Sequence, residues 1–100
     1  LPIIVVIDNN GGLDCISQQQ ERLFDNGKHF ATDFRDIPFH SMFEGLGGHG
    51  ELVETREQLE PALKRAIASG KTACVNVKCR GVISPIVAAT SDKRDKASIE

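Results

Sequence analysis

The strongest constraint on the fold is an apolar run that ends in asparagines and glycines. Residues 3–12 read IIVVIDNNGG. Five β-branched residues in a row are typical of a strand that is buried on both faces of a parallel sheet. The polar residues after the run predict a loop at the carboxyl end of the strand, where open α/β sheets bind their ligands. Asparagine side chains there offer oxygen atoms to a hard cation, and the glycines let the backbone approach it.

The rest of the chain alternates helical and strand patterns. We expect a helix over residues 13–24, a short helix after Pro38, a short strand over residues 51–53, a helix over residues 55–69 and a strand over residues 72–79. Thr55 and Gln58 form a capping-box pattern at the start of the third helix, and Pro61 inside it predicts a kink or a lost hydrogen bond. This order indicates an α/β fold, part of a doubly wound, mostly parallel sheet with flanking helices.

A glycine cluster follows the short second helix. Residues 45–50 read GLGGHG and fit the G-x-G-x-x-G pattern of dinucleotide sites. That pattern requires a strand before it and a helix after it, whereas a helical stripe precedes it here and a strand follows. We therefore interpret the cluster as a helix-to-strand turn. The stripe itself is expected to lie on the sheet and consists of Phe39, Met42, Phe43 and Leu46.

Composition excludes several classes of function. The net charge of −2 is spread along 100 residues without a basic stripe, and Trp and Tyr are absent, so nucleic-acid binding is not expected. No apolar run reaches the roughly 20 residues of a membrane span. Cys74 and Cys79 would face opposite sides of a strand, which favours free thiols and a cytoplasmic location. The chain starts at Leu1 inside an apolar strand and has few partner strands, so we interpret it as a fragment.

The apolar strand followed by Asn9-Asn10 resembles the second half of the thiamine-diphosphate motif of thiamine-dependent decarboxylases and carboligases, the acetolactate synthase-like family. Residues 39–50, 57–63 and 70–72 continue the resemblance in order and spacing. It implies that residues 1–80 are the C-terminal part of an incomplete thiamine-diphosphate-binding fold. Residues 81–100 would form a C-terminal arm or tail, with an apolar patch at residues 83–89 and a charged end at residues 91–100.

The resemblance also implies a set of site residues. Asn10 would give its side-chain oxygen and Gly12 its backbone carbonyl to Mg²⁺, and Gly11 and Leu13 would complete the contact with thiamine diphosphate. The third protein ligand belongs to an upstream Gly-Asp-Gly triplet, and the activating glutamate belongs to another domain, usually of a partner subunit. The resemblance therefore implies a homodimer or homotetramer. Some members of the family bind FAD in a middle domain, and the residues of this chain do not indicate whether the parent protein does so.

The substrate is less constrained than the cofactor. Asp14 and Cys15 inherit a substrate-facing position, although Leu13 and Ile16 also suit the start of an ordinary packing stripe. Asp14, Cys15 and Gln19 stand about where acetolactate synthases carry Gly, Met and Trp.

Three functions are consistent with these residues. The first is an enzyme that decarboxylates or ligates 2-oxo acids, with the isolated fragment inactive. The second, within the family, resembles oxalyl-CoA decarboxylase or 2-hydroxyacyl-CoA lyase. The third is a small non-catalytic α/β binding or interaction module.

Overall fold

The computed structural model describes residues 1–24, 26–82 and 84–89. The chain forms two compact units, which are described separately. The first unit joins Leu1–Asn10 to Asp36–Arg80, and the second joins Gly11–Arg35 to Gly81–Glu100. The predicted charged end at residues 91–100 lies outside the described residues.

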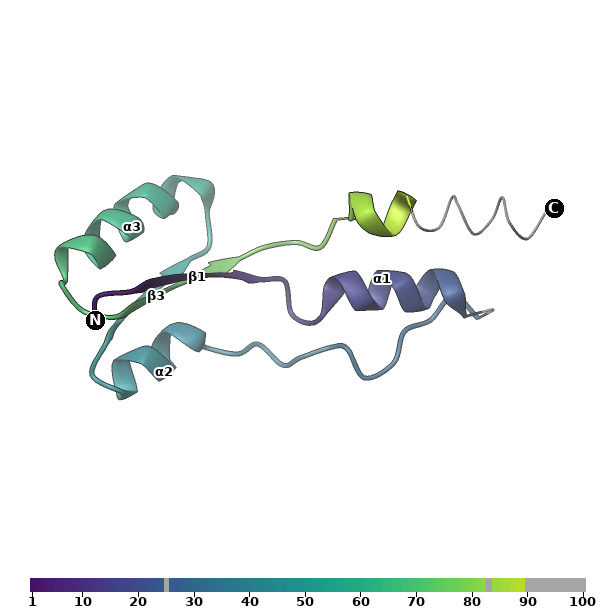
Figure 1. The fold of residues 1–100 in the computed structure, drawn as a ribbon, viewed down its shortest axis with the longest axis horizontal. Coiled ribbons are helices and arrows are strands. Elements are labelled where there is room, and N and C mark those ends of the chain that lie inside the picture. Colours follow the sequence, from purple (N-terminus) through teal and green to yellow (C-terminus); the bar gives the residue numbers. More distant parts are fainter. Residues whose placement is uncertain (25, 83, 90–100) are drawn as a thin grey trace. The chain divides into compact units, whose positions relative to one another are not determined.

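The first unit is a parallel sheet with a helix on each face. Its strands are β1 (Ile4–Asn9), β2 (His49–Val53) and β3 (Ala73–Lys78), in the order β1-β3-β2 with both pairings parallel. Helices α2 (Phe39–Gly45) and α3 (Leu59–Ala68) lie on opposite sides of the strands (Figure 1). This arrangement confirms the predicted α/β class, since short parallel strands need crossovers that place helices on the faces of the sheet.

The hydrophobic core lies between the sheet and α3. Its fully buried members are Val53, Ala62, Ala66, Ala73 and Val75. Small alanines on α3 let the helix backbone approach the central strand closely.

Strand β1 lies at an edge of this sheet. Val5 and Val6 remain 37% and 54% exposed. The sequence predicted that both faces of this strand are buried. Among the described residues, part of the strand remains exposed.

The start of α3 corrects the expectation for Pro61. The capping box of Thr55 and Gln58 is present, and it caps a 3₁₀ turn, η1 (Arg56–Gln58), that comes before α3. Pro61 is thus the third residue of α3 rather than an interior residue. The N–H groups of the first turn have no acceptor within their own helix, so proline there removes no bond from α3. The predicted interior defect was wrong.

The glycine cluster is a helix-to-strand turn, as predicted. Helix α2 ends at Gly45 and β2 begins at His49, and Gly47 has a φ of +85°. The apolar stripe of α2 was only half right. Phe39 and Phe43 are half-buried, but Met42 is 51% exposed within α2. Leu46 is 89% exposed, and the helix ends before it.

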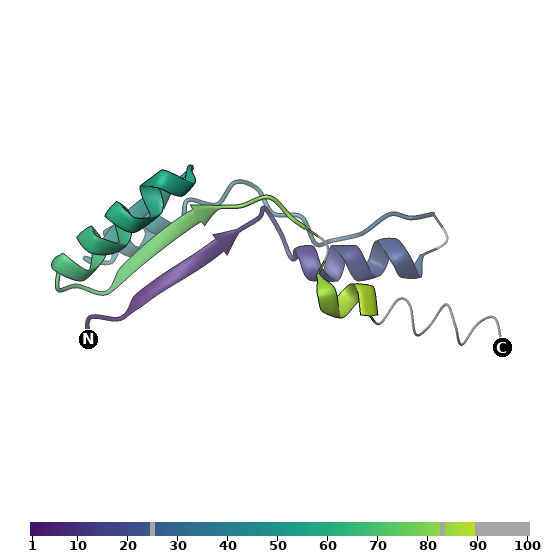
Figure 2. The same cartoon turned by 90° about the horizontal axis from the view of Figure 1, so that it is seen from above.

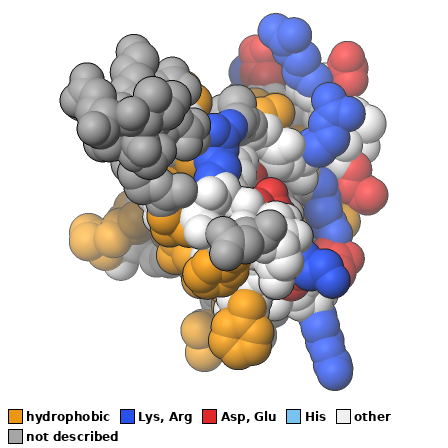
Figure 3. Space-filling model, turned by 90° about the vertical axis from the view of Figure 1, so that its right-hand side faces the viewer, with side chains coloured by type: hydrophobic (Ala, Val, Ile, Leu, Met, Phe, Trp, Pro, Cys, Tyr) orange, Lys and Arg blue, Asp and Glu red, His pale blue; other side chains and the backbone are white. Residues whose placement is uncertain are grey.

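The second unit contains α1 (Asp14–Leu23), an irregular segment over residues 26–35 and a helical turn at residues 85–89 (Figure 2). The predicted apolar stripe of α1 is largely exposed, and its members are Leu13, Ile16, Leu23 and Phe24. The buried residue of α1 is instead Ser17. Exposed apolar side chains are visible on the face drawn in Figure 3. None of the helices that the structure describes is long and apolar enough to cross a membrane.

Candidate functional site

The two adjacent asparagines have different environments. Strand β1 continues through Asn9, whose carbonyl accepts a hydrogen bond of 2.9 Å from the N–H of Cys79. The side chain of Asn9 is buried and donates to Oδ1 of Asn76 at 3.1 Å. Asn10 is half-buried, and its side chain makes no hydrogen bond within the described part of the chain. Asn9 is therefore a structural residue of the strand, and the amide oxygen of Asn10 is available to a ligand.

The backbone at Gly12 is oriented by a short antiparallel pairing with Asp33. Leu13 N–H donates to the carbonyl of Thr32 at 2.8 Å, and Phe34 N–H donates to the carbonyl of Gly11 at 2.7 Å. Because the residues flanking Gly12 make these bonds, its own N–H and C=O point away from the paired segment. Among the described residues, nothing donates to the Gly12 carbonyl. This carbonyl is thus directed outward in the way that a metal ligand requires.

Only glycine fits at position 12. A Cβ atom there would lie 2.4 Å from the carbonyl oxygen of Thr32 and 3.2 Å from Cα of Asp33. Gly11 has a φ of +84°, in the left-handed region that other residues rarely adopt. The Gly-Gly pair is therefore required by the close backbone pairing and by the turn that leads into it.

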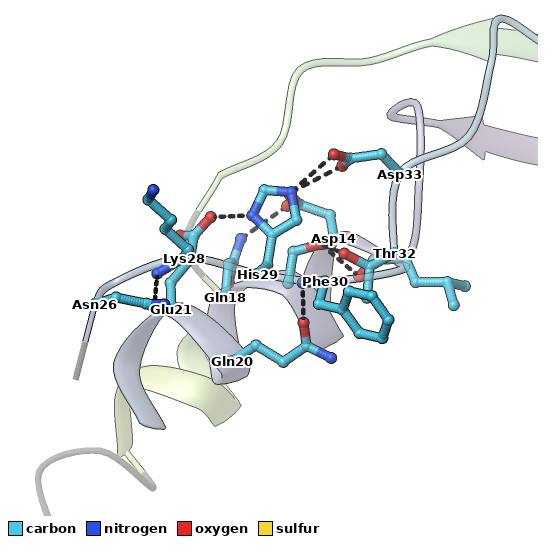
Figure 4. A network of polar contacts seen from close by, with 12 residues as sticks. Asp14, Gln18, Gln20, Glu21, Asn26, Lys28, His29, Phe30, Thr32 and Asp33 are labelled. Atoms are coloured by element: carbon cyan, nitrogen blue, oxygen red, sulfur yellow. Dashed lines mark hydrogen bonds and ion pairs between the residues drawn. The ribbon is translucent and has the colours of Figure 1, made fainter. Parts of the chain in front are cut away.

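The paired segment is held on α1 by polar side chains. The hydroxyl of Ser17 lies 3.3 Å from the carbonyl oxygen of Leu13, and it also forms a hydrogen bond with the hydroxyl of Thr32. Both side chains are buried. Oε1 of Gln20 accepts a hydrogen bond of 2.6 Å from the N–H of Phe30 (Figure 4). These contacts fix the segment against which Gly12 is paired.

His29 joins α1 to the same segment. Its Nδ1 lies 2.7 Å from Oε1 of Glu21 on α1, and its Nε2 lies 2.9 Å from Oδ2 of Asp33 (Figure 4). Hydrogen bonds to Asp33 and then to Glu21 raise the pKa of His29 above its ordinary value. With a carboxylate at each ring nitrogen, His29 is favoured in its doubly protonated, cationic form.

The donor set fits a magnesium ion that binds together with diphosphate. An amide oxygen from Asn10 and a carbonyl oxygen from Gly12 are neutral, hard ligands, which Mg²⁺ accepts alongside anionic phosphate oxygens. The described residues contain no group of three or more His, Cys, Asp or Glu side chains that could hold a metal. The residues that would hold Mg²⁺ are therefore Asn10, through its amide oxygen, and Gly12, through its backbone carbonyl.

The predicted substrate-facing residues lie at the start of α1. Oδ2 of Asp14 accepts a hydrogen bond of 2.7 Å from Nε2 of Gln18. The Asp14 carboxylate also packs so closely on Gly81 that a Cβ there would lie 2.5 Å from it. Cys15 is exposed. The substrate-facing role of Asp14 and Cys15 stays a prediction.

The remaining cysteines and histidines have structural surroundings. Burial raises the pKa of the Cys74 thiol, and a hydrogen bond with Asp8 raises that of Cys79, so both thiols are held in their unreactive form. His49 contacts Glu51 at 2.6 Å, and His40 contacts Asn76 at 3.2 Å.

Sequence reasoning missed most of the residues that support the site. Thr32 and His29 gave no signal because they lie in a segment without any period, and Ser17 gave none because its partner Thr32 lies there. Asn76 did carry one, because a single amide interrupts the apolar strand ACVNV.

Most of the chain matches one family model. The model of the family described as "Thiamine pyrophosphate enzyme, C-terminal TPP binding domain" matches residues 1–77. The chain belongs to this family. The parallel sheet with its flanking helices thus has the fold of the C-terminal domain of thiamine pyrophosphate (thiamine diphosphate) enzymes, the family that the resemblance indicated.

Two kinds of enzyme are similar to this member of the family. A probable acetolactate synthase of Mycobacterium bovis and the acetolactate synthase large subunit of Mycobacterium tuberculosis are each 40% identical to it over 76 residues, 75% of this chain and 14% of the relative. The 2-hydroxyacyl-CoA lyase of Arabidopsis thaliana is 30% identical over 97 residues, 93% of this chain and 16% of the relative. The chain thus spans about a seventh of the length of these relatives.

Proposed function

We propose that this chain supplies part of the protein anchor for Mg²⁺ and the diphosphate of thiamine diphosphate, in an enzyme that acts on 2-oxo acids. Asn10 and Gly12 are the metal ligands, and Gly11 and Leu13 line the cofactor. One observation carries the proposal: the pairing with Asp33 turns the Gly12 carbonyl outward. The different contacts of Asn9 and Asn10 support it. The Asn9 side chain bonds to Asn76, whereas the amide oxygen of Asn10, two residues before Gly12, has no such bond among the described residues.

In this proposal the chain's own residues bind the metal ion and orient the cofactor. Thiamine diphosphate, when bound, supplies the electron sink that lets a 2-oxo acid lose CO₂. Asn10 and Gly12 hold the ion that neutralises the diphosphate. The glycine pair lets the backbone approach the phosphate oxygens, which a side chain would keep at a distance.

The rest of the machinery lies outside this chain. An aspartate of a Gly-Asp-Gly triplet and an activating glutamate would come from other parts of a cytoplasmic homodimer or homotetramer. Residues 1–80 would then be the C-terminal part of the binding domain and residues 81–100 an arm or tail. The 100 residues alone are expected to show no turnover.

A second substrate class has its own support. The match with 2-hydroxyacyl-CoA lyase covers 97 residues, against 76 for the acetolactate synthases, and so extends past β3. Cleavage of a 2-hydroxyacyl-CoA needs the same metal and diphosphate anchor and differs in the groups that face the substrate. Asp14 and Cys15 would belong to that part of the site in either enzyme.

Calorimetry on the full-length protein tests the anchor. We expect thiamine diphosphate to bind only with Mg²⁺, and Asn10→Ala to weaken binding at least tenfold because it removes one ligand oxygen. Asn10→Asp is the matched variant, since it keeps an oxygen at the same position and should retain metal-dependent binding. Wild-type protein that does not bind, or an Asn10→Ala variant with unchanged affinity, would refute the anchor.

A parallel assay separates the two substrate classes. The same protein is supplied either with pyruvate or with a 2-hydroxyacyl-CoA. Formation of acetolactate supports the first class, and release of an aldehyde supports the second.

A further inference from the structure

A buried amide interrupts the central strand of the sheet. Asn76 is fully buried in β3, where its neighbours Cys74 and Val75 are also fully buried. Burying an amide costs roughly 1–3 kcal/mol unless its hydrogen bonds are replaced within the protein. An apolar residue at this position would avoid that cost. The reason for an amide is therefore to be found in its hydrogen-bond partners.

The partners of Asn76 come from two other parts of the first unit. Its Oδ1 accepts from Nδ2 of Asn9 at 3.1 Å, and its Nδ2 lies 3.2 Å from Nδ1 of His40 on α2. The carbonyl of Ile37, just before α2, lies within 3.5 Å of the amide nitrogens of both asparagines. The network therefore ties the last residue of β1 to the central strand and to the entrance of α2.

The position of this network is informative. The strand ladder already fixes the register of β1 against β3 from Ile4↔Ala73 to Asn9↔Lys78. An additional bond at the end of the strand is not needed for register. The N–H of Cys79 already holds the carbonyl of Asn9. The network adds a second contact, through the Asn9 side chain, at the residue after which the chain leaves the sheet.

We propose that Asn76 is a positioning residue for the magnesium site, acting through Asn9 on Asn10. This inference rests on the proposed function, because it takes Asn10 as a metal ligand. Holding Asn9 by its side chain restricts the peptide that carries Asn10, so the ligand oxygen is oriented before the ion binds. A preoriented ligand loses less conformational freedom on binding, and partners of this kind typically contribute 10–100-fold to metal affinity.

The test is a Mg²⁺ titration of the full-length protein at saturating thiamine diphosphate. Asn76→Leu should raise the Mg²⁺ concentration at half-saturation by 10–100-fold. Cys74→Ala is the matched control, since Cys74 is fully buried on the same strand and the same face. It should lower the melting temperature of the apoprotein without moving the Mg²⁺ titration.

Two further variants connect the effect to the pair. Asn9→Leu should shift the titration as Asn76→Leu does, and the double variant should be no worse than either single one, because both remove the same bond. If Asn76→Leu yields no folded protein, Asn76→Thr replaces it, since threonine suits a strand but is too short to reach Asn9.

The outcomes are distinguishable. A titration of Asn76→Leu within twofold of wild type, with a lowered melting temperature, shows a purely structural role and overturns the inference while the anchor stands. Wild-type protein that fails to bind thiamine diphosphate with Mg²⁺ overturns the proposed function, and the inference with it.

Discussion

Substitution of Gly12 gives the sharpest test of the backbone pairing at the site. In Gly12→Ala the new Cβ would lie 2.4 Å from the Thr32 carbonyl oxygen, whereas Cβ atoms in proteins essentially never come closer than 3.0 Å. The backbone at Gly12 and the backbone at Thr32 must therefore separate by at least about 0.6 Å. This separation lengthens the 2.8 Å hydrogen bond from the N–H of Leu13 to the carbonyl of Thr32. Overpacking of this kind costs about 1–3 kcal/mol, and loss of a hydrogen bond adds about 1 kcal/mol.

That penalty sets the expected size of the effect on binding. A total of about 2–4 kcal/mol corresponds to about 30- to 700-fold in affinity if all of it has to be overcome when the ligand binds. Calorimetric titration of the full-length protein with thiamine diphosphate at fixed Mg²⁺ measures it. Gly45→Ala is the control, because its Cβ would meet nothing within 4 Å. A Gly12→Ala variant that binds within threefold of wild type would show that the pairing does not direct the Gly12 carbonyl.

Two pH-dependent predictions follow from the ion pairs. The cationic His29 stabilises the Asp33 segment on α1 below its ordinary pKa of 6.5, and this contribution is lost as the pH rises through the raised pKa of the folded state. Hydrogen-exchange protection of the Leu13 and Phe34 amides, relative to His29→Gln and corrected for intrinsic rates, should fall over that range; a pH-independent ratio would contradict it. The hydrogen bond with Arg65, at 2.7 Å, holds the pKa of Glu51 below its ordinary value of 4.5. Glu51→Gln should therefore lower the urea midpoint at neutral pH, and the difference should vanish as the pH falls through the lowered pKa; a difference that persists in strong acid would argue against this ion pair.

Most of the first unit was predictable because its signals are local. The apolar run, the capping box of Thr55 and Gln58 and the glycine turn each depend on residues that are neighbours in the sequence. The error at Pro61 was one of boundary: a 3₁₀ turn takes the first residues of the predicted helix, so the proline falls in the first turn of α3.

The second unit was less predictable because its packing is polar. The periodicity of α1 predicted a buried face of Leu13, Ile16 and Leu23, but the described residues bury Ser17 there instead. The apolar face of a helix need not be the face that its own unit buries. The segment that packs against the helix determines which face is buried. In α1 these contacts come from a segment without regular structure, and its sequence has no pattern from which they could be predicted.

The Asn-Asn pair shows where sequence and structure give different information. Composition treats the two residues as equivalent, yet β1 ends between them, so that Asn9 pairs with Asn76 and Asn10 does not. The register partners of Asn9 and Asn76 are Lys78 and Ile7, so the two amides meet diagonally across the strands, whereas no described residue pairs with the side chain of Asn10. Asn76 is thus the residue by which the two roles could have been separated in advance. If Asn10 binds Mg²⁺ as proposed, the buried amide of Asn76 has a function in this chain, because it fixes one asparagine so that the next can bind.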